Sequence, residues 1–195
     1  AEMLKLLAAD GAVAALTLMQ ETDVLRHVLP VDVDLAPLRT LIVIDPDSDA
    51  LLRLAALLRS AADGRQAIHA VAAWRLSNVE TTRLERLVRQ PRLALPISVG
   101  DGRRNAYRLG ATAYLDLLRL SADTKEQLDD ALPVPEIPPF PLTGQDLIDR
   151  RMPPGPKVGT LLKQLEDWWL DHDLEPDRDA CLAELDRRLE IPGNP

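Results

Sequence analysis

Closely spaced aspartates are the residues of this chain whose type and spacing come nearest to a catalytic pattern. Two carboxylates in an Asp-x-Asp pair can hold the metal ions of nucleotidyl transfer when a glycine-rich turn beside them holds the phosphates. The chain contains neither a Gly-Gly nor a Gly-Ser dipeptide, and most of the pairs lie at expected helix ends, where acids serve as caps. We therefore expect no catalytic residue here. The pairs are Asp32/Asp34, Asp45/Asp47, Asp47/Asp49, Asp171/Asp173 and Asp177/Asp179.

A metal centre is the second chemistry to consider. His172 and Asp173 resemble the metal-binding pair of HD phosphohydrolases, a site that also needs His and Asp ligands from neighbouring helices. The other two histidines are His27 and His69, and neither has suitable company in the sequence. We expect no metal site and no cofactor in this chain.

The segment from Gly155 to Gly159 is a candidate anion site. Gly155 is expected to cap a helix and Pro156 to occupy its first position, where a missing N–H costs nothing. The N–H groups of Lys157, Val158 and Gly159, together with the positive end of the helix dipole, should bind an anion, most naturally a phosphate. The two glycines would let another backbone approach closely. The alternative is a plain helical hairpin that needs only caps and a turn.

Two helices must position this segment. Thr143 is expected to cap the first helix, with Asp146 reaching back to it from the third position. The prolines of MPPGP end that helix, because each withholds an N–H and restricts the residue before it. The second helix carries one apolar stripe at helical spacing, formed by Val158, Leu161, Leu162, Leu165 and Trp169.

The stretch from Phe140 to Leu170 resembles the C-terminal signature of bacterial class II CCA-adding tRNA nucleotidyltransferases, the branch that also contains bacterial poly(A) polymerases. Three other stretches are similar to that family in the same order: EMLKLL at 2–7, WRLSNVE at 74–80 and RRNAYRLGATAYLDLL at 103–118. Arg151 departs from the pattern, because the family usually has glycine there at the end of the first hairpin helix. Arginine would be uncomfortable at that position if it requires a positive φ.

This resemblance implies an all-α fold: an elongated array of about ten short helices that forms the body and tail of the enzyme without its catalytic α/β head. We expect residues 1–45 to end the neck and start the body, 46–132 to complete the body, 133–141 to be a proline-rich linker and 142–195 to form the tail. The opening residues look like the middle of a helix with no cap, which suggests a truncated start. The head would precede Ala1, and Mg²⁺ with the substrates CTP and ATP would belong to that parent enzyme.

The family also implies a partner, because its body and tail hold the elbow of tRNA while head and neck perform CCA addition. The contacts we expect are a basic strip and the helix start, namely Arg75, Arg103, Arg104, Arg108, Gly155, Lys157, Val158 and Gly159. Two alternatives stay open. The chain could be the same region of a poly(A) polymerase, or a non-catalytic helical module that binds protein.

The charge distribution bears on that choice. The net charge is −8, which disfavours nucleic acid at first sight. Residues 75–110, however, contain eight basic and three acidic groups, whereas both flanking segments are acidic. A basic middle could track a phosphate backbone. The alternative is that these arginines lie on solvated helix faces and pair with nearby acids.

Composition supports a helical, intracellular protein. The 195 residues are 46% hydrophobic but only 3% aromatic, a mixture that favours helices over sheets. Cys181 is the single cysteine, which suits a reducing and hence cytoplasmic compartment. No apolar run approaches the ~20 residues of a membrane helix, and the only strand-like runs are 41–44 and 93–99. We expect helices over 2–9, 12–22, 35–44, 50–59, 67–74, 78–90, 101–109, 111–120, 124–132, 144–150, 156–170 and 176–190.

Overall fold

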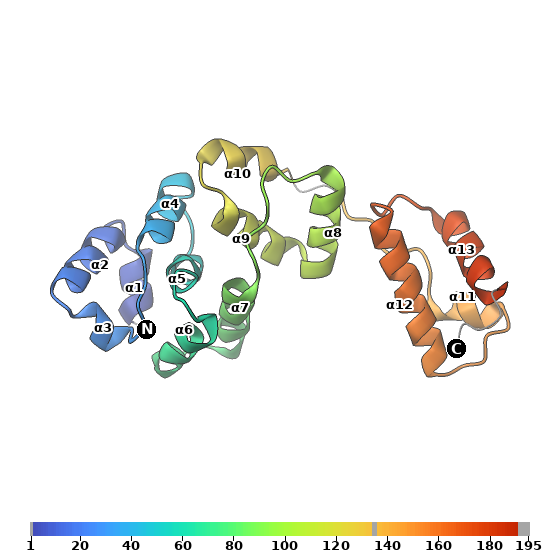
Figure 1. The fold of residues 1–195 in the computed structure, drawn as a ribbon, viewed down its shortest axis with the longest axis horizontal. Helices are drawn as coiled ribbons and strands as arrows, with labels where there is room; N and C mark the ends of the chain where they lie inside the picture. Colours follow the sequence, from blue (N-terminus) through green and yellow to red (C-terminus); the bar gives the residue numbers. More distant parts are fainter. Residues whose placement is uncertain (1, 134–135, 191–195) are drawn as a thin grey trace. The chain divides into compact units, whose positions relative to one another are not determined.

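The computed structural model describes residues 2–133 and 136–190, and within them every regular element is a helix (Figure 1). The all-α class is therefore confirmed, with thirteen α-helices and one 3₁₀-helix in the described part of the chain. They are α1 (Glu2–Ala8), α2 (Ala12–Glu21), α3 (Leu25–Val28), α4 (Ala36–Ile44), α5 (Ala50–Leu58), α6 (Gly64–Ala70), η1 (Ala72–Trp74), α7 (Asn78–Arg89), α8 (Val99–Leu109), α9 (Ala111–Ser121), α10 (Lys125–Ala131), α11 (Gly144–Asp149), α12 (Pro156–Asp171) and α13 (Arg178–Glu190).

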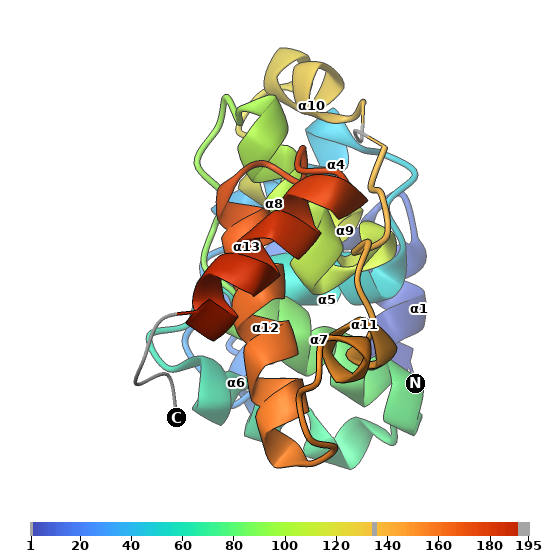
Figure 2. The same cartoon turned by 90° about the vertical axis from the view of Figure 1, so that its right-hand side faces the viewer.

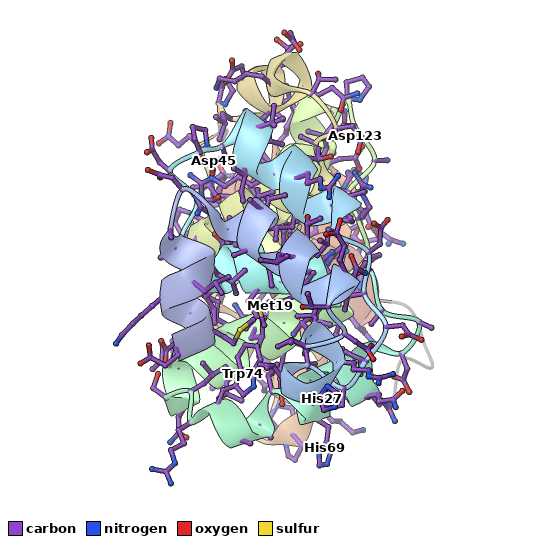
Figure 3. All side chains as sticks on the ribbon, turned by 90° about the vertical axis from the view of Figure 1, so that its left-hand side faces the viewer. Met19, His27, Asp45, His69, Trp74 and Asp123 are labelled. Carbon is purple, nitrogen blue, oxygen red and sulfur yellow. The ribbon has the colours of Figure 1, made fainter. Side chains whose placement is uncertain are left out.

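The chain forms two compact units, and the first contains residues 2–97 and 109–133. Its centre is α5, which is capped by Asp49. The Asp49 carboxylate accepts the N–H groups of Leu51 and Leu52 at 2.9 Å each. All residues of α5 after Ala50 are buried, because α1, α4, α6, α7 and α9 all pack against it. Figure 3 looks onto this unit, with Met19 and Trp74, both packed against the core, near the middle of the view.

Buried polar groups fix the position of α5 within that core. The guanidinium of Arg53 donates to the Ser48 hydroxyl (3.2 Å), the Leu7 carbonyl (2.8 Å) and the Pro46 carbonyl (2.5 Å). Each of the three guanidinium nitrogens of Arg53 thus has an acceptor, as burial of a polar group requires. The same bonds join the end of α1 and the turn before α5 to the central helix.

The second unit contains residues 98–108 and the described part of 134–195. Within this unit α12 packs against both α11 and α13, and Figure 2 shows these three helices together. Trp169 lies at the centre of their core: it is buried, its Nε1 donates to the Pro176 carbonyl at 2.9 Å, and Tyr107 and Phe140 meet it edge-on. The other buried members of this core are Leu142, Leu147, Leu161, Leu165, Leu170, Leu174, Cys181 and Leu185.

Helix α8 groups with this second unit although the sequence division placed it in the body segment, 46–132. The Tyr107 hydroxyl donates to Glu166 at 2.5 Å, and its ring meets Trp169 at a centroid distance of 5.5 Å. The carboxylate of Asp173 lies where a side chain on Gly100 would have to be. Periodicity alone could not show this grouping, because it depends on contacts made some 60 residues further along the chain.

Most expected helices are present, with small differences at their ends. Helix α3 was not expected, the helix predicted over 67–74 begins at Gly64 and ends in 3₁₀ geometry, and α8 begins at Val99. The run 41–44 is helical, and 93–99 contains no strand. The expected linker, 133–141, is irregular where described, while residues 134–135 and 191–195 lie outside the described part of the chain.

None of the helices among the described residues is long and apolar enough to cross a membrane. Cys181 is fully buried, and burial, followed by the charge of Asp177, raises the pKa of its thiol to about 11. A thiol in this state is a packing group and not a nucleophile.

Candidate nucleic-acid interface

The hairpin predicted to form the anion site is present, and α11 opens it as expected. The Asp146 carboxylate accepts the N–H of Thr143 at 2.7 Å and its hydroxyl at 2.9 Å. The same carboxylate pairs with Arg178 at the start of α13, and Arg178 also donates to the Pro141 carbonyl at 2.7 Å. The bond from Arg178, and then that from Thr143, lowers the pKa of Asp146 to about 2.

Helix α11 ends in a Schellman motif with arginine at the position that usually holds glycine. The N–H of Met152 donates to the Leu147 carbonyl (3.2 Å) and the N–H of Arg151 to the Ile148 carbonyl (2.9 Å), the two bonds that define this ending. Arg151 has φ 66° and is exposed. The sequence therefore pointed correctly to a strained position, because a side chain in left-handed geometry costs about 1–2 kcal/mol.

Helix α12 begins as predicted at an exposed Pro/Gly turn. Gly155 caps it with φ 154°, a conformation that suits glycine, and Pro156 is the first helical residue. Gly155, Lys157 and Gly159 are exposed, so no neighbouring side chain fills the turn. One expectation was wrong: the N–H of Val158 is not free, because it donates to the Gly155 carbonyl at 3.0 Å in a tight first turn.

Gly159 has no structural reason to be glycine. An added Cβ would meet nothing within 4 Å, and its φ is not in the positive range. Glycine inside a helix is less stable than alanine by roughly 0.5–1 kcal/mol, so the fold alone would favour a larger residue. Close approach of another backbone requires open space and a residue without a side chain. The start of α12 provides both at Gly159.

The predicted basic strip is not assembled around this turn. Arg104 pairs with Asp101 and Asp173, and Arg103 lies 3.9 Å from Glu175, just beyond the C-terminal end of α12. Lys157 lies in the first turn, at the opposite end of this 16-residue helix, which is about 24 Å long at 1.5 Å per residue. Arg103 and Arg104 therefore follow the alternative interpretation of the basic strip, in which the arginines pair with nearby acids.

The remaining two arginines of the strip are exposed but belong to different units. Arg75 is in the first unit, at the end of η1, with φ 54°. Arg108 is in the second unit, near the end of α8. Within the second unit the candidate contacts thus form two separate groups, and Arg75 belongs to the first unit.

Arg151, which departs from the pattern of the resembled family, is a further candidate contact. It is exposed, and no ion pair among the described residues includes it, whereas the adjacent Arg150 pairs with Asp186 at 2.6 Å. Arg151 and Lys157 therefore place a positive charge on each side of the Met152–Gly155 turn. The signal in the sequence was an arginine at a position where the resembled family usually has glycine. Backbone strain of this kind can be retained where it serves function.

The candidate metal ligands take other partners. The Nδ1 of His172 lies 2.7 Å from the Trp168 carbonyl, and Asp173 binds Arg104. His27 and His69 lie toward the lower edge of Figure 3, away from Asp45 and Asp123 at its upper edge. Within the described residues, no three His, Cys, Asp or Glu side chains are grouped so that they could hold a metal ion.

Comparisons with known proteins do not add an assignment. A scan against protein-family models found no matching family, and a search of curated proteins found no match.

Proposed function

We propose that this chain is the tRNA-binding body and tail of a CCA-adding tRNA nucleotidyltransferase, whose chemistry resides in an N-terminal head. The four stretches similar to that family support the class of protein. The exposed turn before α12, flanked by Arg151 and Lys157, supports a site for an RNA phosphate. Recognition would be of phosphates and shape and not of sequence.

The observation that carries this proposal is the start of α12. Gly155 is needed for the turn, but Gly159 weakens the helix without a packing reason. Lys157 adds a full charge beside the main-chain amides, at the positive end of a 16-residue helix. A phosphate that approaches this turn would meet the main-chain donors other than the N–H of Val158, a cation and no obstructing side chain.

Binding of tRNA by the chain, measured as a function of salt, tests the proposal. We expect measurable affinity at low salt that falls steeply as salt rises, and Lys157→Ala should weaken it about tenfold while leaving the helical circular dichroism unchanged. Lys163→Ala is the matched control, because Lys163 is an exposed lysine of the same helix, six residues further along. Equal dissociation constants for the two variants would remove the turn from the proposed site.

The two alternative functions are tested separately. The 3′ products of the full-length enzyme distinguish CCA addition from poly(A) synthesis, since a defined CCA end excludes the second. A protein-binding module would show no tRNA binding even at low salt. Its mark would be a contiguous apolar patch, but the exposed large apolar side chains among the described residues occur on separate segments: Leu18, Val24, Val43, Val79, Val99 and Leu189.

A further inference from the structure

A groove on the first unit, between α7 and the start of α9, is distinct from the turn discussed above. Its volume is about 410 Å³, within the size range of ligand sites. Val79, Thr82 and Arg86 line it from α7, and Thr112 and Ala113 line it from α9. Its walls are mainly apolar and small, with hydroxyls and guanidinium groups among them.

The acid at this groove is already neutralised. Asp116 is buried and accepts two bonds from Arg83, at 2.8 and 3.1 Å, and Arg119 lies 3.7 Å from it. Arg83 also pairs with Asp49 at 2.7 Å. These ion pairs engage the Arg83 guanidinium, so Asp116, the acid that lines the groove, is already paired.

Arg86 is the cation that remains available. It is exposed, its one described hydrogen bond is a long one of 3.4 Å to the Leu109 carbonyl, and no ion pair in the described part of the chain includes it. The first turn of α9 lies across the groove. Its cap, Gly110, has no side chain that could accept bonds from the N–H groups that follow. The positive potential of these N–H groups therefore adds to that of Arg86.

We propose that this groove binds a segment of RNA, with a backbone phosphate at Arg86 and the apolar wall around Val79 and Ala113 against a ribose or base. Charge complementarity selects this occupant: the available charges are positive, and the one buried acid is paired. The inference rests on the proposed function, because it takes RNA as the partner. It adds a contact on the first unit that is independent of the α12 turn.

A pair of valine variants tests the groove without disturbing the core. Val79 is 78% exposed, and Val43, on α4, is 77% exposed and outside the groove. Val79→Glu should weaken tRNA binding about tenfold, whereas Val43→Glu, with the same added charge, should change it by less than about twofold. Val79 lies in the first turn of α7, where a carboxylate favours the helix dipole, so Val79→Glu should fold at least as well as the wild type.

A charge deletion provides the second arm. Arg86→Ala should weaken binding and reduce the slope of log affinity against log salt by about one, and Arg65→Ala, an exposed arginine of α6, should not. If Lys157→Ala weakens binding but the variants of Val79 and Arg86 behave like their controls, the groove is overturned while the proposed function stands. If the wild type binds no tRNA at low salt, both fail.

Discussion

Gly159 shows how a single residue can separate the needs of the fold from those of a binding site. It is exposed and helical, and a Cβ atom added to it would meet no atom within 4 Å. We predict that Gly159→Ala raises the free energy of unfolding by about 0.5–1 kcal/mol, because alanine has the higher helix propensity. Urea unfolding followed by tryptophan fluorescence measures this change.

The same variant should bind tRNA more weakly than the wild type, since a methyl group would occupy the space that a phosphate backbone needs. A variant that is both more stable and equally tight in binding would show that this glycine has no part in recognition.

Arg151 provides a second prediction at the residue scale. Its φ of 66° is unfavourable for a side chain, so Arg151→Gly should raise the free energy of unfolding by about 1 kcal/mol. Arg151→Asn removes the charge but keeps a residue that tolerates this geometry, and it therefore separates strain from charge. We expect both variants to lose tRNA affinity to a similar degree, which filter binding would measure.

At the scale of elements, Asp146 joins the starts of α11 and α13. Its folded pKa of about 2 lies below the ordinary value of 3.8. A lowered carboxyl pKa stabilises the fold at pH values above the ordinary pKa. This stabilisation is lost as the pH falls from about 4 toward 2. Glu184, whose pKa is also lowered to about 2 by Arg187 and then by Arg188, acts in the same direction within the same unit.

We predict that Asp146→Asn lowers the stability of the second unit by about 2 kcal/mol at neutral pH, because Arg178 loses its charged partner. The difference from the wild type should shrink as the pH falls to 2 and below, because the wild-type carboxyl becomes protonated in that range. Thermal unfolding across this pH range checks the prediction. Asp149→Asn is the control, as Asp149 is an exposed acid of the same helix.

Local signals predicted most of these elements. Helix α7 begins at a capping box, in which Glu80 accepts the Ser77 N–H at 2.8 Å, and α12 starts at its Pro/Gly turn as expected. The candidate site was predicted only where it depends on the local backbone, as at Gly155. The partners of Arg103 and Arg104 could not be foreseen, because Glu175 and Asp173 come from another helix end about 70 residues away.

At the scale of the whole molecule, two separate apolar cores indicate two units of stability. Leu165 is fully buried in the core around Trp169, and no residue is shared with the core around α5. We predict that Leu165→Ala lowers the stability of the second unit by about 3 kcal/mol. Hydrogen exchange should then accelerate in α8 and in α11 to α13 but not in α1 to α7. Equal acceleration throughout would mean that the chain unfolds as one cooperative body.

The placement of α8 has a consequence for how this protein is made. The chain leaves the first unit after residue 97, contributes α8 to the second, returns at 109 and departs again after 133. On the ribosome, Tyr107 emerges about 60 residues before Trp169, a wait of roughly 3–12 s at ordinary rates of synthesis. During that interval α8 has no partner within its own unit, so its apolar residues are accessible to chaperones. A chain truncated at the proline-rich segment, 133–141, would leave α8 permanently without this partner.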